Sequence, residues 1–181
     1  MGSIYLNGLS ITPIISAEKA FFQMPTAISA SKKDNIHIST KGHGGGGIDI
    51  LARKGKGRYS SLTLFELKDE NTESESPEMV MKQALSYATF LVKLIECKGD
   101  SVWTAFGYGQ KSKFETINHN NTIIVCCLMP NINKKGELAR IPSFVGIQPF
   151  VVGDYKLELH YLYFEELEDG LIRVARSSLI K

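Results

Sequence analysis

Three residues near the middle of the sequence have the side-chain types needed for metal-assisted chemistry. Asp49 and Glu66 are carboxylates, and Lys68 follows Glu66 by two positions. Their neighbours along the chain are largely apolar, and buried charges are normally paired or bound to metal ions. A hard divalent cation such as Mg²⁺ takes oxygen ligands, commonly one or two carboxylates together with waters and substrate phosphates. Asp49 and Glu66 could supply such carboxylates, with Lys68 beside a metal-bound water.

The segment 46–68 is typical of a β-hairpin that would bring these residues together. Strand alternation places Glu66 and Lys68 on one face of the second strand. With the turn centred on Gly57 and Arg58, Asp49 lies directly opposite Glu66. Directly opposed residues share a face of the sheet. We therefore predict that the three charges converge.

The second strand of this hairpin, which ends in Glu66-Leu67-Lys68, carries apolar residues on both faces. Such a pattern is typical of a strand that is covered on both sides. Exposed strands also place glutamate and lysine on one face as a solvated ion pair, which is the simpler interpretation of Glu66 and Lys68. The apolar residues on both faces favour a buried site.

The chain resembles the PD-(D/E)xK nuclease superfamily, also called restriction-endonuclease-like, over roughly its first two thirds. The matching residues are an acid, an acid-x-lysine triplet and a Gln-x-x-x-Tyr pair on the next helix: Asp49, Glu66-Leu67-Lys68, Gln83 and Tyr87. The last pair is similar to the RecB-like branch. Ile48 stands where the name of the superfamily has a proline.

The resemblance implies metal-dependent cleavage of phosphodiesters. Asp49, Glu66 and the Leu67 carbonyl would hold one or two Mg²⁺ or Mn²⁺ ions, which lower the pKa of a bound water. Lys68 would orient that water and stabilise the charge that builds on the phosphoryl oxygens. A lysine beside two carboxylates stays protonated, so electrostatic stabilisation is favoured over a general-base role.

Gln83 and Tyr87 are four residues apart and share one side of a helix. In the functional interpretation, Gln83 hydrogen-bonds near the lysine or the substrate backbone, and Tyr87 presents its hydroxyl to the site. In the alternative, Tyr87 belongs to the core and Gln83 lies at its edge.

Glu18 is the acid of an expected first helix, for which Ser16 is the N-cap. In many members of the superfamily a carboxylate on this helix completes the metal shell, so Glu18 is a further candidate ligand. The interpretation that we prefer is that Glu18 favours the positive end of the helix dipole.

The expected hairpin turn is basic, with four positive side chains: Arg53, Lys54, Lys56 and Arg58. Contacts of lysine and arginine with phosphates supply most sequence-independent affinity for nucleic acids. We expect this loop to project from the metal site and to contact DNA or RNA, although charged turns are also commonly just solvated.

A glycine-rich run, residues 42–47, precedes Asp49. It lacks the Gly-Lys-Ser/Thr ending of a P-loop and leads into a strand, so a P-loop is excluded. Its backbone amides could still approach a phosphate. A flexible or bulged connection between strands is the equally good alternative.

Composition places the chain among ordinary globular proteins. It has 181 residues, 43% of them hydrophobic, and a formal net charge of +2, which does not by itself indicate a nucleic-acid-binding protein. It has no run of about 18 apolar residues and no signal-peptide pattern, so we expect a cytoplasmic protein without a membrane partner. Cys97, Cys126 and Cys127 are expected to be buried, with the adjacent pair on opposite strand faces, and the scattered histidines do not indicate zinc.

The predicted fold class is α/β, with a restriction-endonuclease-like core in which helices flank a central mixed sheet (α-β-β-β-α-β), followed by a C-terminal β-hairpin. A single domain spans 1–181, with its core at about 11–130 and an extension at about 131–181. The expected elements after the first helix are a strand at 35–40, the hairpin, a helix from Pro77 to about Lys98, a short helix within 100–109, a buried strand at 122–129, and a hairpin of 155–164 with 171–176.

The function predicted from these features is a metal-dependent nuclease that hydrolyses DNA in repair, recombination or defence. The C-terminal hairpin is a candidate edge for a homo-oligomer. One alternative is a nucleic-acid-binding or assembly module that keeps the fold without turnover. A weaker alternative is a structural protein whose hairpin charges lie on its surface.

Overall fold

The computed structural model describes residues 4–6, 9–13, 24–26, 28–30, 37–38, 46–55, 61–68, 75–97 and 121–179. Its strands and its helix have these bounds: β1 Ile4–Leu6, β2 Leu9–Pro13, β3 Met24–Pro25, β4 Ile28–Ser29, β5 His37–Ile38, β6 Gly47–Ile48, β7 Ile50–Lys54, β8 Ser61–Leu67, α1 Pro77–Glu96, β9 Thr122–Pro130, β10 Phe150–Val152, β11 Tyr155–Glu166 and β12 Ile172–Ser177.

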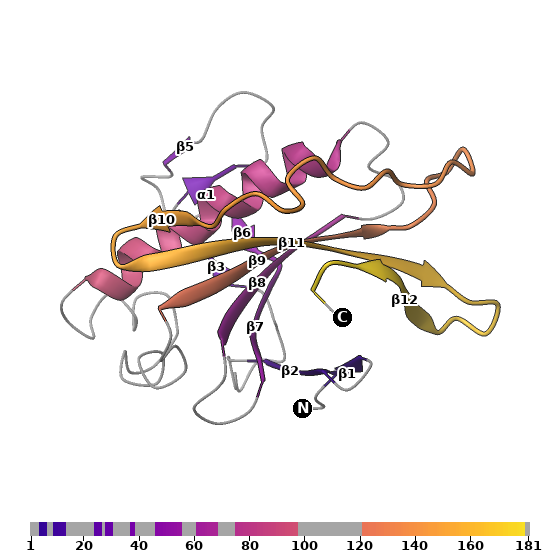
Figure 1. Ribbon diagram of the computed structural model, residues 1–181, viewed down its shortest axis with the longest axis horizontal. Helices are drawn as coiled ribbons and strands as arrows, with labels where there is room; N and C mark the ends of the chain where they lie inside the picture. The colour runs from indigo at the N-terminus through magenta and orange to yellow at the C-terminus, as the bar shows by residue number, and fades with distance from the viewer. Residues whose placement is uncertain are drawn as a thin grey trace.

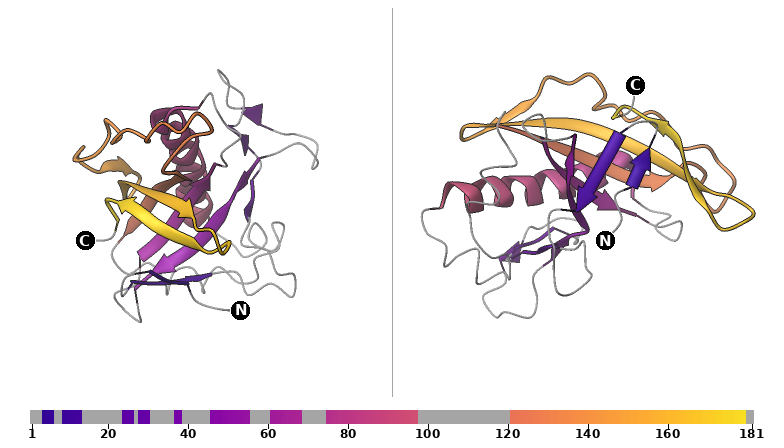
Figure 2. Two further views of the ribbon diagram at one scale, coloured as in Figure 1. Left: turned by 90° about the vertical axis from the view of Figure 1, so that its right-hand side faces the viewer. Right: turned by 90° about the horizontal axis from the view of Figure 1, so that it is seen from below.

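A central sheet of eight strands organises these elements. Its order is β1-β2-β7-β8-β9-β11-β10, and β12 also pairs with β11. The sheet is mixed, because β2, β7 and β8 pair antiparallel whereas β8, β9 and β11 pair parallel. Helix α1 connects the parallel strands β8 and β9 and lies across one face of the sheet (Figures 1 and 2).

Helix α1 begins as the sequence predicts. The Ser76 hydroxyl accepts a hydrogen bond from the Met79 amide at 3.3 Å, and Pro77 occupies the first helical position, where its missing amide hydrogen costs nothing. The helix ends at Glu96, slightly earlier than expected, and the Cys97 amide donates to the Lys93 carbonyl. Cys97 is exposed at this terminus, so the prediction that it is buried is wrong.

Both faces of the sheet are apolar. On the face beneath α1, Leu62 and Leu64 of β8 pack with the helix, whereas Phe65 belongs to a second cluster on the opposite face. Cys127 and Cys126 divide between the two clusters in the same way, as strand alternation predicts. Strands β8 and β9 are buried on both faces, so a polar residue within β8 is desolvated.

The predicted helices and first strand need correction. Among the described residues, α1 is the only helix, so the expectation of several flanking helices is not met there; the positions of the expected first helix and of the short helix at 100–109 lie outside the described residues. From the expected strand at 35–40, His37 and Ile38 pair with β4 in a separate two-stranded sheet. Alternation of polar and apolar residues predicts a strand but not the strand with which it pairs. In the structure β2 pairs with β7, where the strand at 35–40 was expected.

The C-terminal half confirms two predictions. The apolar run at 122–129 forms β9, which is buried and parallel to β8. Strands β11 and β12 form the predicted hairpin, in which the Gly170 amide donates to the Leu167 carbonyl and Gly170 has a φ of 77°. The hairpin extends the central sheet, because β11 pairs along β9. Among the described residues, no helix combines the length and apolar character needed to cross a membrane.

Candidate functional site

Antiparallel pairing of β7 and β8 positions Asp49. The ladder pairs Ile50 with Phe65 and Leu51 with Leu64, which is the predicted register. Asp49 lies in a bend just before β7, next to the end of β8. Its Oδ2 accepts a hydrogen bond from the Leu67 amide at 2.8 Å. The start of one strand and the end of the next therefore bring Asp49 to the Glu66-Leu67-Lys68 backbone.

Glu66 is a buried carboxylate with an unused oxygen. The residue is 2% exposed, because β8 is covered on the face that carries it. Its Oε1 lies 3.5 Å from Nζ of Lys68. Its Oε2 is buried and has no hydrogen-bond partner among the described residues. An unpaired buried carboxylate oxygen is unfavourable, so this position favours either a proton or a cation.

Lys68 follows β8 and lies among three oxygen atoms. Its Nζ donates to Oε1 of Gln83 at 2.9 Å and lies 3.2 Å from Oε2 of Glu75, in addition to its contact with Glu66. The Lys68 amide donates to the Leu128 carbonyl at 2.9 Å, which continues the parallel pairing with β9. With its backbone and its ammonium both held, Lys68 has a defined position.

The electrostatics of the three residues are coupled. Burial, followed by the neighbouring charge of Asp49, raises the pKa of Glu66 to about 8, although Lys68 opposes this rise. Burial also raises the pKa of Asp49, against the opposing effects of the Leu67 amide and Lys68. Burial lowers the pKa of Lys68, but Glu66 and Glu75 outweigh burial, so the net shift is upward. Lys68 is therefore an ammonium at neutral pH, whereas Glu66 holds a proton in the absence of another cation.

Gln83 and Tyr87 come from the inner face of α1. Gln83 is buried and contacts Lys68, as the functional interpretation predicts. Tyr87 is 1% exposed, and its hydroxyl accepts a hydrogen bond from the Ala30 amide at 3.4 Å. That hydroxyl also lies against Gly46, where an added Cβ would be 2.2 Å from it. Tyr87 thus supports the backbone that leads to Asp49.

Gly46 has a structural explanation. Its amide donates to the Ile28 carbonyl at 2.8 Å and its carbonyl accepts from the Thr26 amide at 3.0 Å. Because that amide is already used, Gly46 does not offer it to a phosphate. Its lack of a side chain instead makes room for Tyr87. Residues 42–45 of the glycine-rich run lie outside the described residues.

Glu75 is the site residue that the sequence interpretation missed. It lies in the acidic segment before α1, which would ordinarily be solvated, yet its side chain is 22% exposed and contacts Lys68. The usable signal was its position directly before the N-cap Ser76, because a helix start fixes the adjacent backbone. Acidity and hydropathy alone did not distinguish Glu75 from its neighbours.

Arg53 and Lys54, the basic residues of the hairpin that the structure describes, lie away from this cluster. Arg53 and Lys54 are at the far end of β7, about 13 Å or more from Asp49 at the usual rise of a strand. Lys54 Nζ donates to the Leu179 carbonyl at 3.0 Å, which ties it to the C-terminal segment. Arg53 and Lys54 therefore lie in β7 and not in the expected turn, so that placement is corrected; their contact with nucleic acid stays a prediction. Lys56 and Arg58 lie outside the described residues, as does Glu18.

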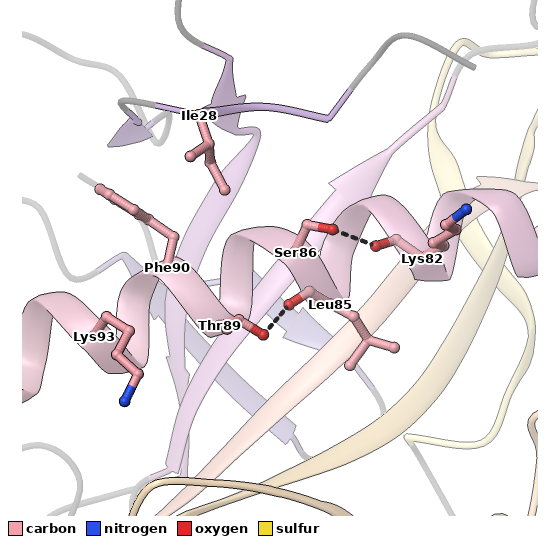
Figure 3. A pocket seen from close by; sticks show the side chains of 7 residues that line it. All are labelled: Ile28, Lys82, Leu85, Ser86, Thr89, Phe90 and Lys93. Atoms are coloured by element: carbon pink, nitrogen blue, oxygen red, sulfur yellow. Dashed lines mark hydrogen bonds between the residues drawn. The ribbon is translucent and has the colours of Figure 1, made fainter. Parts of the chain in front are cut away.

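A separate hollow lies on the outer side of α1 and is mainly apolar (Figure 3). The Ser86 and Thr89 hydroxyls donate to helix carbonyls at 2.9 and 2.8 Å. Gln83 points inward to Lys68, so the hollow and the acidic cluster lie on different sides of the helix. The residues that line the hollow are Ile28, Lys82, Leu85, Ser86, Thr89, Phe90 and Lys93.

The carboxylates of the cluster are of the chemical type that a hard divalent cation binds. Among the described residues no group of three histidine, cysteine, aspartate or glutamate side chains gathers as a metal site. Two carboxylates are nevertheless a common protein contribution to Mg²⁺ binding, since waters and substrate complete the shell. Asp49 and Glu66 are such a pair, and the unpartnered Glu66 Oε2 is the oxygen best placed to gain from a cation.

Comparisons with protein-family models, with curated proteins and with solved structures give no match to this chain.

Proposed function

We propose that this protein is a Mg²⁺- or Mn²⁺-dependent nuclease that hydrolyses phosphodiester bonds of DNA. The observation that carries the proposal is the convergence of Asp49, Glu66 and Lys68 at the end of β8, with one oxygen of Glu66 buried and unpartnered. This combination of two carboxylates and an ammonium suits a reaction in which a cation and a phosphate meet.

The order of elements supports the proposal. Strands β7 and β8 pair antiparallel and are followed by α1 and by β9, which is parallel to β8. The resemblance to PD-(D/E)xK nucleases implies this order for the last two antiparallel strands, the second helix and the final strand. Strand β2, which pairs with β7, precedes the expected first helix and does not correspond to the expected strand at 35–40. Asp49 directly precedes β7, Glu66 lies in β8, and Lys68 directly follows β8, which is the neighbourhood that the same resemblance implies.

The residues have separable tasks in this proposal. Asp49 and Glu66 would hold the cation, and the Leu67 carbonyl is the remaining candidate ligand. When bound, the cation would polarise the phosphate and lower the pKa of a water. Lys68, which is protonated, would stabilise negative charge on the phosphoryl oxygens, because an ammonium in a partly buried site acts more strongly than one in water. Gln83 holds Lys68 by accepting a hydrogen bond from it.

The test is a cleavage assay on several forms of nucleic acid. Supercoiled plasmid, linear duplex, single-stranded DNA, branched DNA and RNA are incubated with Mg²⁺, Mn²⁺ or EDTA. We expect cation-dependent cleavage of DNA by the wild type and by Glu168→Gln, which changes an exposed acid on the β11–β12 turn. Asp49→Ala should abolish it.

Two results would reject the proposal. Cleavage that survives in Asp49→Ala or in EDTA would show that the activity comes from elsewhere. DNA binding that EDTA does not affect, without nicking at high protein concentration in Mn²⁺, would favour a binding or assembly module on the same fold.

A further inference from the structure

The ammonium of Lys68 has a partner that the proposed mechanism leaves without a role. Oε2 of Glu75 lies 3.2 Å from Nζ of Lys68, closer than the 3.5 Å between Nζ and Oε1 of Glu66. The side chains of Lys68 and Glu75 are 14% and 22% exposed, so this ion pair is substantially shielded from water. The carboxylate nearer to the lysine is therefore not the one in the Glu-x-Lys triplet.

Glu75 is fixed by the start of α1. The next residue, Ser76, caps the helix through its side chain, and its carbonyl accepts hydrogen bonds from the Met79 and Val80 amides. Glu75 Oε2 is buried without a hydrogen-bond partner among the described residues. The ammonium of Lys68 is the charge that offsets it. The fixed backbone of Glu75 and its buried Oε2 atom together keep its carboxylate beside the ammonium of Lys68.

Two of the three partners of Lys68 approach from the helix. Glu75 precedes α1 and Gln83 lies within it, whereas Glu66 belongs to β8. If Glu66 engages a cation, Lys68 keeps the two partners on the helix side. Without Glu75, the carboxylate of Glu66 would be the one ion-pair partner left within 4 Å of the Lys68 ammonium among the described residues, and the ammonium would compete with a cation for it.

We infer that Glu75 is a positioning residue: together with Gln83 it holds the Lys68 ammonium on the α1 side of the site and leaves the carboxylate of Glu66 to a divalent cation. This inference rests on the proposed nuclease function, since it assigns Glu75 a task in cation binding. The task requires no direct contact of Glu75 with cation or substrate.

The first measurement tests, in the absence of a divalent cation, whether Glu75 restricts the motion of the Lys68 ammonium. The side-chain ¹⁵Nζ resonance of Lys68 is observed by NMR in EDTA and assigned by its loss in Lys68→Arg. An ammonium held by Glu75 and Gln83 should give a resolved signal in the wild type and in Glu168→Gln. Glu75→Gln, which keeps the shape of the side chain and removes its charge, should broaden or remove it. Circular dichroism verifies that each variant is folded.

The second measurement reports the consequence for the cation. Calorimetric titration with Mn²⁺ should show that Glu75→Gln weakens binding about tenfold, equivalent to about 1.4 kcal/mol. The same change in a Lys68→Ala background should alter the affinity by less than about twofold, because no ammonium remains to compete. Cleavage by Glu75→Gln at subsaturating Mn²⁺ should fall and should recover as Mn²⁺ is raised.

The outcomes separate the two proposals. An unchanged Lys68 resonance in Glu75→Gln overturns the inference, whatever the cleavage assay gives. An equal loss of Mn²⁺ affinity with and without Lys68 also overturns it, because Glu75 would then act through its own charge. A wild type that neither binds Mn²⁺ nor cleaves DNA overturns the nuclease function and the task assigned to Glu75, while the resonance still shows whether Glu75 holds Lys68.

Discussion

Glu66 is the residue of the cluster whose pKa the fold raises to about 8. It lies in β8 beside buried apolar residues such as Leu64 and Phe65, so its carboxylate loses water together with them. Asp49 lies near enough to disfavour a second negative charge, and Lys68 offsets only part of the effect. Two such acids titrate as a pair. The proton that this pair retains near neutral pH is one that a cation would displace, as metal binding at protein sites commonly does.

The raised pKa of Glu66 predicts how stability depends on pH. Between the unfolded value of 4.5 and the folded value of about 8, the folded protein binds the extra proton, so the free energy of unfolding should fall as pH rises through this range. Each pH unit of difference corresponds to about 1.4 kcal/mol at most. Urea unfolding in EDTA at pH 5 to 8 should show this decline in the wild type and a shallower one in Glu66→Gln. Equal slopes in the two proteins would mean that Glu66 is not the group responsible.

Lys68→Ala tests the task of the ammonium. Because Glu66 can remain protonated without Lys68, this variant should keep its fold while its cleavage rate falls by about 100-fold or more, the usual effect of losing one charged group that stabilises a transition state. Single-turnover cleavage at saturating Mn²⁺ measures the rate. Lys156→Ala, which removes an exposed lysine from β11, is the matched control and should cleave normally. Undiminished turnover in Lys68→Ala would remove Lys68 from the mechanism.

Helix α1 closely approaches the backbone of Gly46, which leads through β6 to Asp49. The hydroxyl of Tyr87 occupies the space beside Gly46 in which a side chain would begin. The same helix also carries Gln83, which accepts a hydrogen bond from Lys68. Helix α1 therefore supports the backbone before Asp49 and also positions Lys68. A change at this contact should therefore be detectable at Asp49.

Gly46→Ala should destabilise the protein by about 1–3 kcal/mol, because the new methyl group would overlap the Tyr87 hydroxyl. Tyr87→Phe removes that hydroxyl and should by itself cost about 1 kcal/mol, from its hydrogen bond with the Ala30 amide. The double variant should be more stable than the sum of the two effects implies, as thermal unfolding of all four proteins would reveal. Strict additivity would place the strain of Gly46→Ala elsewhere, at the Ile28 carbonyl.

The elements that sequence could predict are those determined by local rules. The register of β7 with β8 follows from the turn position, and the start of α1 follows from Ser76 and Pro77. The partners of short strands are decided by tertiary packing, so the pairing of β5 with β4 could not be predicted from residues 37–38. Glu75 was missed for a similar reason. Its contact with Lys68 depends on how α1 returns over the sheet, which hydropathy does not encode.

Across the whole molecule, the acidic cluster lies at the end of the sheet where β8 stops and α1 starts. Antiparallel pairing brings the start of β7 to this same end and sends Arg53 and Lys54 to the other. A nucleic acid that contacted both the cluster and those residues would have to extend about 13 Å or more along the hairpin. A cation at the cluster would link Asp49, before β7, with Glu66 in β8, and would thereby join two neighbouring strands of the folded sheet.

That link predicts a cation-dependent gain in stability. A ligand that binds only the folded state stabilises it by about 2.7 kcal/mol at 100 times its Kd, which for a protein of this length corresponds to a rise in Tm of roughly 5–10 °C. Thermal unfolding with saturating Mn²⁺ should show this rise in the wild type and in Glu168→Gln, and little of it in Asp49→Ala, each compared with the same protein in EDTA. The comparison within each variant removes the effect of the substitution on the fold itself. A full rise in Asp49→Ala would mean that the cation binds away from the carboxylates that join β7 to β8.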